Sequence, residues 1–206
     1  MLKSTTTGDT FALQARYTRT AVILHWLIAG LIFVNIALGF VAGHSADPLH
    51  RNALNFHKPI GLCVLGLSLV RLSWRLTHKP PRLRIRLANW ERLLSNAAHV
   101  SFYGLMIALP MTGWLLSSAV PKRHPIEIPG IVIFPFLPVA ASASTAKLAD
   151  GAHVTLAYFA VVTILLHIAG VVKHQVVDRH DILTRMRLRK RGGVGPMRSS
   201  DVGHER

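Results

Sequence analysis

Five of the twelve histidines in this 206-residue chain lie within or beside long apolar segments: His25, His57, His99, His153 and His167. Ionisable side chains inside segments of this kind are rare and are functional candidates by default. Two imidazoles that face each other between helices can supply both axial ligands of a haem iron. These histidines are therefore candidates for haem ligation.

The spacing of the histidines predicts two facing pairs. His153 and His167 are 14 residues apart, which returns them to within about 40° of one helix face and separates them by about 21 Å along it. In an antiparallel bundle His57 then falls at the level of His153 on the outer side, and His25 at the level of His167 on the inner side. A hydrogen-bonded structural role is the alternative for any single histidine, whereas a zinc site would need its ligands gathered around one ion.

Basic side chains near these levels could bind haem propionates. Arg71 follows His57 by 14 residues, so it lies on nearly the same face, one leaflet further in. Arg19 approaches the inner level from the first apolar segment, and Lys58 the outer level. The alternative for each is membership of the ordinary basic belt at a membrane interface.

Four apolar segments must position these residues, at 21–43, 59–76, 97–120 and 151–172. Each comes close to the roughly 20 residues that a bilayer requires, and only 16% of the chain is charged, against about 25% in soluble domains. We expect an all-α, integral membrane four-helix bundle over residues 21–176, with an N-terminal arm (1–20) and a basic tail (177–206). The single cysteine, Cys63, excludes an intramolecular disulfide framework.

The distribution of positive charge predicts the orientation. Nineteen Lys and Arg residues lie on the side of both termini and five on the other side, which places both termini in the cytoplasm. The basic tail is interpreted as an anchor that touches anionic membrane lipid, not as a nucleic-acid site.

On the outer side, Lys122 and Arg123 could steer a small anion towards the outer haem; solvated loop charge is the alternative. Residues 126–139 are apolar but broken by three prolines, so they predict a surface lid and not a fifth span. An apolar ligand slot is expected either beside this lid or at the inner level near Trp26 and His99.

Several motifs resemble the bacterial cytochrome b561 family over residues 16–186. These are the run 17–20 before Leu24-His25-Trp26, the segment His57-Lys58-Pro59-Ile60-Gly61 ending at 71–76, His99 with Pro110-Met111-Thr112-Gly113-Trp114, and His153 with His167-Ile168-Ala169-Gly170 before Lys173-His174. The four-segment order of the family is intact. Differences from the family pattern fall mainly in residues 120–152 and in the tail.

The resemblance implies a four-helix protein of the bacterial cytoplasmic membrane with two b haems, which exchanges electrons with quinone. The family's ligand pattern falls on His25, His57, His153 and His167, while the role of His99 stays open. One branch of the family oxidises periplasmic superoxide and reduces ubiquinone. Other members serve as cytochrome subunits of partner oxidoreductases such as hydrogenases.

Three function classes follow. As an enzyme, the chain would pass electrons from superoxide or a similar one-electron donor to ubiquinone. As an electron-transfer subunit, it would need a partner oxidoreductase, and a homo-oligomer is also compatible with the sequence. As a haem-binding structural or sensor protein, it would need no substrate. The outer basic residues and the lack of a large soluble docking domain favour the first.

Overall fold

The computed structural model describes residues 17–78, 88–128, 130–179 and 183–186. Within them, four helices are long and apolar enough to cross a membrane, which confirms the predicted all-α membrane bundle. They are α1 (Arg19–His44), α2 (Leu49–Thr77), α3 (Asn89–Ala119) and α4 (Ala143–Val172). A π-helical turn, η1 (Lys173–Val177), continues α4, and a short 3-10 helix, η2 (Leu183–Met186), follows. The predicted N-terminal arm and basic tail lie largely outside the described residues.

Three helices begin well before the apolar segments that predicted them. The first residues of α2, α3 and α4 are Leu49, Asn89 and Ala143. Their first turns carry polar side chains, so a criterion of hydropathy alone does not detect them, although the backbone continues its helical hydrogen bonds there. As a result His57 lies in the third turn of α2 and not at its start.

Side chains at the helix ends satisfy backbone groups that have no partner inside the helix. Thr18 Oγ1 accepts a hydrogen bond from the backbone N–H of Ala21 at 3.3 Å and another from Trp74 Nε1 at 3.0 Å. Thr18 therefore caps α1 and also joins it to the last turns of α2. At the start of α3, Glu91 Oε2 accepts a hydrogen bond from the backbone N–H of Ala88 at 3.0 Å.

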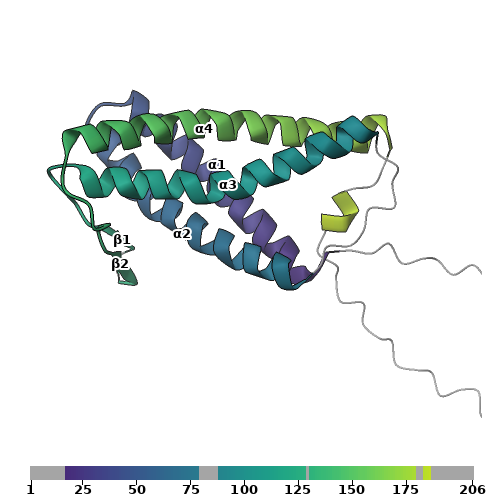
Figure 1. Ribbon diagram of the computed structural model, residues 1–206, viewed down its shortest axis with the longest axis horizontal. Coiled ribbons are helices and arrows are strands. Elements are labelled where there is room, and N and C mark those ends of the chain that lie inside the picture. The colour runs from purple at the N-terminus through teal and green to yellow at the C-terminus, as the bar shows by residue number, and fades with distance from the viewer. Residues whose placement is uncertain (1–16, 79–87, 129, 180–182, 187–206) are drawn as a thin grey trace, which may run out of the picture.

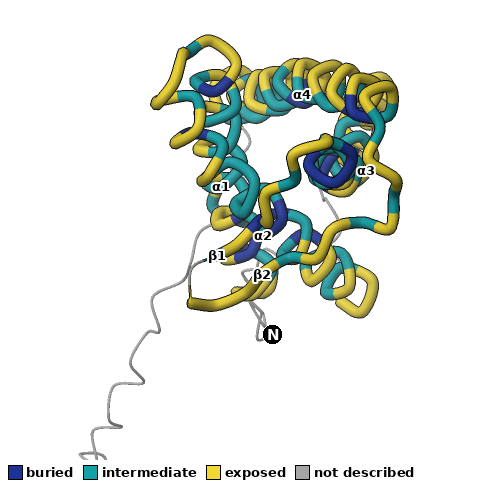
Figure 2. The backbone as a smooth tube through the Cα atoms, turned by 90° about the vertical axis from the view of Figure 1, so that its left-hand side faces the viewer, coloured by how far each residue is buried: buried dark blue, intermediate teal, exposed yellow. Residues whose placement is uncertain are grey.

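The helices form two antiparallel hairpins, α1–α2 and α3–α4, which pack on each other mainly through α2 and α3. Figure 1 shows the two hairpins crossing obliquely, and Figure 2 looks along the bundle and shows the helices arranged around its axis. We call the end that carries Arg19 and η2 the terminal end, and the end that carries the β-strands the loop end. A buried cluster of Ile28, Val64 and Met106 joins the hairpins.

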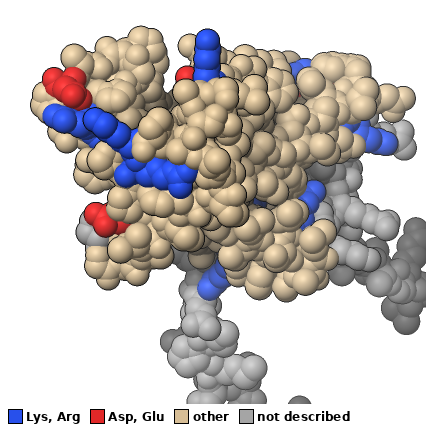
Figure 3. All heavy atoms as spheres, turned by 60° about the vertical axis from the view of Figure 1, so that its left-hand side comes forward, with Lys and Arg blue, Asp and Glu red and all other residues tan. Residues whose placement is uncertain are grey.

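Most of the outer surface of the helices is apolar and exposed. Large side chains such as Phe33, Phe40 and Leu165 have 55%, 66% and 62% of their surface exposed. In the space-filling view of Figure 3 the flank of the bundle is almost free of charged side chains, and Lys, Arg, Asp and Glu gather mainly near the ends. A lipid environment accounts for this surface, because apolar side chains can be exposed to hydrocarbon without the free-energy penalty that they would have in water.

The segment between α3 and α4 forms a small antiparallel hairpin of β1 (Ile126–Ile128) and β2 (Val132–Phe134). Gly130 has a φ of 73° at its turn, a conformation that glycine adopts without strain. Two hydrogen bonds to α3 hold the segment that follows, from Trp114 Nε1 to the Pro135 carbonyl at 2.9 Å and from the Leu137 N–H to Ser118 Oγ at 3.0 Å. The segment does not form a fifth span, as predicted, and its role as a lid remains a prediction.

Candidate functional site

His57 and His153 face each other at the loop end of the bundle. They come from different hairpins, α2 and α4, and their ring centroids are 5.9 Å apart with an interplanar angle of 83°. Both side chains are half-buried. The structure thus brings together the two histidines that the sequence places at the outer level, and we call them the loop-end pair.

The ring of His57 is held by the backbone of α1. Its Nδ1 lies 3.0 Å from the carbonyl oxygen of Asn35. A carbonyl oxygen only accepts hydrogen bonds, so Nδ1 carries the proton and Nε2 keeps its lone pair. This is the tautomer in which an imidazole can bind a metal through Nε2, and such a hydrogen bond also orients the ring.

The ring of His153 is held by the backbone of α3 in the same way. Its Nδ1 lies 3.0 Å from the carbonyl oxygen of Leu109 and 3.1 Å from Thr112 Oγ1. The Thr112 hydroxyl itself donates to the Leu109 carbonyl at 2.8 Å. Both members of the loop-end pair therefore have Nε2 free for a ligand.

Three histidines and an arginine gather at the terminal end; we call His25, His99, His167 and Arg71 the terminal-end group. The ring centroids of His99 and His167 are 6.0 Å apart, and Phe102 lies 5.3 Å from His167. His25 lies within electrostatic range of both of these histidines. His99, whose role the sequence leaves open, is therefore part of this group and is adjacent to His167.

Arg71 lies against His25, with its Nη1 3.0 Å from His25 Nδ1. A guanidinium only donates hydrogen bonds, so Nδ1 of His25 is the acceptor and the proton of a neutral ring is on Nε2. His25 thus differs from the loop-end pair in its tautomer and in its direct hydrogen bond from a guanidinium. The sequence predicts Arg71 at this level and does not predict its contact with His25.

The buried cluster of Ile28, Val64 and Met106 separates the two histidine levels with apolar side chains. Two buried oxygens near these levels, Asn35 Oδ1 and Ser68 Oγ, have no hydrogen-bond partner among the described residues. Buried polar atoms normally have a partner, so each of these oxygens is available to a donor that the described residues do not supply.

The other predicted basic residues differ in their surroundings. Lys58 is half-buried beside His57 and makes no hydrogen bond or ion pair with any residue that the structure describes, while Arg19 is exposed at the start of α1. Lys122 is exposed. Arg123 donates to the Val139 carbonyl at 2.9 Å and lies 5.6 Å from the Phe136 ring centroid, so it holds the loop instead of extending into solvent.

At the terminal end the chain folds back over α1. Trp26 Nε1 donates a hydrogen bond to the carbonyl of Met186, in η2, at 3.0 Å. Figure 1 shows η2 lying between the diverging ends of the two hairpins. The last described turn of the chain therefore covers part of this end of the bundle.

An ion network joins the start of α3 to the end of α4. Lys173 Nζ lies 2.5 Å from Glu91 Oε1 and 2.9 Å from Asp178 Oδ2, and His174 Nδ1 lies 2.7 Å from Asp178 Oδ2. The hydrogen bond from Lys173, followed by that from His174, lowers the pKa of Asp178. Glu91, His174 and Asp178 are close enough to bind one cation, but the Lys173 ammonium already binds both carboxylates.

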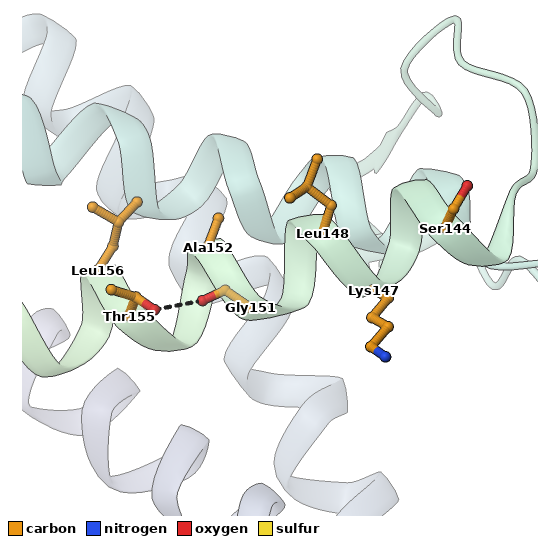
Figure 4. Close-up of a pocket in the computed structure, with 7 residues that line it drawn as sticks. All are labelled: Ser144, Lys147, Leu148, Gly151, Ala152, Thr155 and Leu156. Atoms are coloured by element: carbon orange, nitrogen blue, oxygen red, sulfur yellow. Dashed lines mark hydrogen bonds between the residues drawn. The ribbon is translucent and has the colours of Figure 1, made fainter.

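A separate hollow of about 760 Å³ lies on the loop-end half of α4 (Figure 4). It is lined by Ser144, Lys147, Leu148, Gly151, Ala152, Thr155 and Leu156. The Thr155 hydroxyl donates to the Gly151 carbonyl at 2.8 Å, and the Ser144 hydroxyl is hydrogen-bonded to that of Ser142 at 2.8 Å, which leaves the Lys147 ammonium as the remaining polar side-chain group of the lining. None of the histidines lines this hollow.

Sequence reasoning missed the residues that hold the loop-end rings. These are the carbonyls of Asn35 and Leu109, the hydroxyl of Thr112, and Gly39, which lies against the His57 ring. A backbone carbonyl has no sequence signature. Only the pairing of α1 with α2 and of α3 with α4 shows which one faces a histidine.

Comparison with known proteins shows a match to one protein family and similarity to individual relatives. Residues 16–188 match the family described as prokaryotic cytochrome b561. The chain is 31% identical over 173 residues to cytochrome b561 homolog 2 of Escherichia coli strain K12, covering 83% of this chain and 90% of that protein. It is 35% identical over 71 residues to cytochrome b562 of Cereibacter sphaeroides, covering 32% of this chain and 45% of that one. The chain therefore belongs to the prokaryotic cytochrome b561 family of membrane electron-transfer proteins.

Proposed function

We propose that this cytochrome holds two b haems and passes electrons from superoxide, at its loop end, to ubiquinone. The observation that carries the proposal is the loop-end pair, His57 and His153, whose rings face each other at 5.9 Å with both Nδ1 atoms bound to backbone carbonyls. Haem b supplies reversible one-electron chemistry to a site of this kind.

The loop-end residues fit a haem with two axial histidines. The Nε2 lone pairs of both rings are available to a ligand. Gly39 and Gly113 lie beside the rings, where the methyl group of an alanine would crowd them. If His57 and His153 both held the iron, they would leave no position for oxygen to bind to it. Electrons would then enter and leave at the edge of the cofactor, as in an electron relay.

At the terminal end we propose His25 and His167 as the ligands of the second haem. Arg71 would bind a propionate, because a carboxylate is a stronger acceptor for a guanidinium than a neutral imidazole. Its departure from His25 Nδ1 would free that nitrogen to carry the proton, which leaves Nε2 for the iron. Arg19 would support the same level, and Lys58 would bind a propionate of the loop-end haem.

The positive-inside rule places the terminal end in the cytoplasm and the loop end in the periplasm. Each superoxide anion gives up one electron and becomes O₂. Two such electrons, with two protons, reduce one ubiquinone to ubiquinol. Lys122 is an exposed cation at the loop end and would attract superoxide to it.

The quinone slot has two candidate positions. One is beside the β-hairpin at the loop end, where the chain folds back on α3. The other is at the terminal end, where Trp26, His99 and the Met186 carbonyl lie close to the second histidine level. The second position separates the acceptor from the donor side by the thickness of the membrane.

The alternative function is that of a cytochrome subunit that links a partner oxidoreductase, such as a hydrogenase, to the quinone pool. One observation favours it. Arg123 is bound to the Val139 carbonyl and the Phe136 ring, which leaves less positive charge free to attract an anion than the sequence predicts.

Reduction of the purified chain by superoxide in the presence of a ubiquinone analogue separates the two functions. We expect rapid haem reduction by superoxide and formation of quinol without any added protein. Slow reduction that becomes fast only when a co-purified oxidoreductase is added would assign the chain to the second function.

A further inference from the structure

We propose that Gly39 and Gly113 are positioning residues of the loop-end pair. Each lies on a helix that supplies no ligand to this pair, and each lets the histidine of the next helix lie against the helix backbone. We call them the contact glycines. The proposal rests on the proposed haem site and specifies what orients its ligands.

On α1, a Cβ atom at Gly39 would lie 3.0 Å from Cε1 and 3.3 Å from Nδ1 of His57. Asn35, whose carbonyl accepts the His57 hydrogen bond, precedes Gly39 by four residues, and residues four apart in a helix lie on the same face. The His57 ring therefore spans one turn of α1, with Nδ1 at the Asn35 carbonyl and its edge over Gly39.

On α3 the same arrangement recurs. A Cβ atom at Gly113 would lie 3.1 Å from Cε1 and 3.4 Å from Nδ1 of His153. Leu109, whose carbonyl accepts the His153 hydrogen bond, precedes Gly113 by four residues. Each hairpin thus presents its histidine through one motif, a carbonyl followed by a glycine one turn later.

The other helical glycines show that this closeness is specific. A Cβ atom would meet nothing within 4 Å at six of them, and at Gly61 it would meet only Asn35 Nδ2 at 3.4 Å. The six are Gly30, Gly43, Gly66, Gly104, Gly151 and Gly170. Among the described glycines, therefore, close approach to a histidine ring occurs at the contact glycines and not at their neighbours on the same helices.

The chemical consequence concerns the direction of the Nε2 lone pair. A methyl group at 3.0–3.1 Å from the ring is tighter than ordinary van der Waals contact, so the ring must shift by a few tenths of an ångström. That shift would lengthen the hydrogen bond to the carbonyl and turn Nε2 away from the opposing histidine. The hydrogen bond at the other ring nitrogen sets both the orientation and the basicity of a metal-binding imidazole.

The test uses the purified full chain in four variants. Gly39→Ala and Gly113→Ala introduce the methyl group against the rings. Gly43→Ala on α1 and Gly104→Ala on α3 introduce the same group into open space and are the matched controls. Low-temperature EPR and redox titration follow the two haems separately, with His57→Ala and His167→Ala used to assign their signals.

We expect Gly39→Ala and Gly113→Ala to shift the low-spin EPR signal and midpoint potential of the loop-end haem, or to remove that haem. The terminal-end haem should be unchanged in the same molecules, which shows that they are folded. Both controls should match the wild type.

Wild-type signals in both contact-glycine variants would overturn the proposal. So would equal changes in the controls, or loss of both haems together, because the effect would then not be specific to the loop-end pair. Wild-type protein with no haem would overturn the proposed function itself.

Discussion

The imidazole rings of His57 and His153 stand nearly perpendicular to each other, with centroids 5.9 Å apart, across the interface of the two helical hairpins. Neither ring depends on its own helix for its orientation. Backbone carbonyls of α1 and α3 accept a hydrogen bond from Nδ1 of each ring, so both rings carry their proton on Nδ1. The proposed loop-end haem site depends on that relationship.

The two haem levels should be separable by mutation. We expect His57→Ala or His153→Ala to leave about one haem per chain, the terminal-end one, because about 21 Å of helix separates the levels and no histidine can serve both. His25→Ala or His167→Ala should leave the loop-end haem instead. Haem content and EPR of each purified variant measure this. Loss of the same haem in His25→Ala and His153→Ala would show that the pairs are wrong.

Replacing Arg71 by Gln should lower the midpoint potential of the terminal-end haem. A nearby positive charge stabilises the reduced state, and its loss at a partly buried site is expected to cost on the order of 1.4 kcal/mol, or about 59 mV for a one-electron couple. Arg75→Gln, one turn further along α2, is the control, because Arg75 lies over the Tyr103 ring. A redox titration in which both variants shift equally would argue against a specific role for Arg71.

Replacing Thr112 by Val should raise the midpoint potential of the loop-end haem by a smaller amount. The hydroxyl lies 3.1 Å from His153 Nδ1, and a polar partner at Nδ1 makes the imidazole a stronger donor to the iron. Among the described residues His57 Nδ1 has only the Asn35 carbonyl as a hydrogen-bond partner, so the effect is confined to one of the two ligands. An unchanged potential would mean that the Leu109 carbonyl alone determines the basicity of His153.

Exposed charge at the loop end should affect the rate of reduction by superoxide. Lys122→Gln should slow this rate about two- to threefold at low salt, and the difference should disappear as salt rises, because the screening length is about 8 Å at physiological ionic strength. Arg92→Gln, an exposed residue near the start of α3 at the terminal end, makes the same change of net charge and is the control. Stopped-flow absorbance at several salt concentrations measures both. Equal slowing in the two variants would indicate a general charge effect.

The ion network at the end of α4 should depend on pH. Hydrogen bonds from Lys173 and then His174 lower the pKa of Asp178. Its contribution to stability is therefore present above the usual aspartate pKa of about 3.9 and is lost as the pH falls through the lowered value. Asp178→Asn should speed amide hydrogen exchange in η1 at neutral pH, where wild type is protected. The difference in exchange rate between the two proteins should vanish at the acidic pH where Asp178 is protonated. A difference that persisted at that pH would contradict this explanation.

Much of the fold could be predicted from the sequence, because each apolar segment is long enough to span a bilayer and must satisfy its own backbone hydrogen bonds. The starts of α2 and α3 could not be predicted in this way, because charged residues interrupt the apolar pattern while the helix continues. These are Arg51 and Lys58 in α2, and Glu91 and Arg92 in α3. Helix periodicity was enough to match His57 with His153 in depth.

Contacts between hairpins could not be predicted in this way. Periodicity gives the level and face of a residue along its own helix but not its distance from residues on other helices. The 6.0 Å approach of His99 to His167 and the hydrogen bond from Arg71 to His25 depend on how α2, α3 and α4 cross. Likewise, Arg123 has the sequence features of a free cation, and only the folded loop brings the Val139 carbonyl within its reach.

The most direct test of the central claim is the haem content of the purified full chain, measured by the pyridine haemochrome assay together with low-temperature EPR. The account predicts two b haems per chain, both low-spin, because each iron would have two axial histidines. One haem per chain, or a high-spin signal from either site, would contradict it.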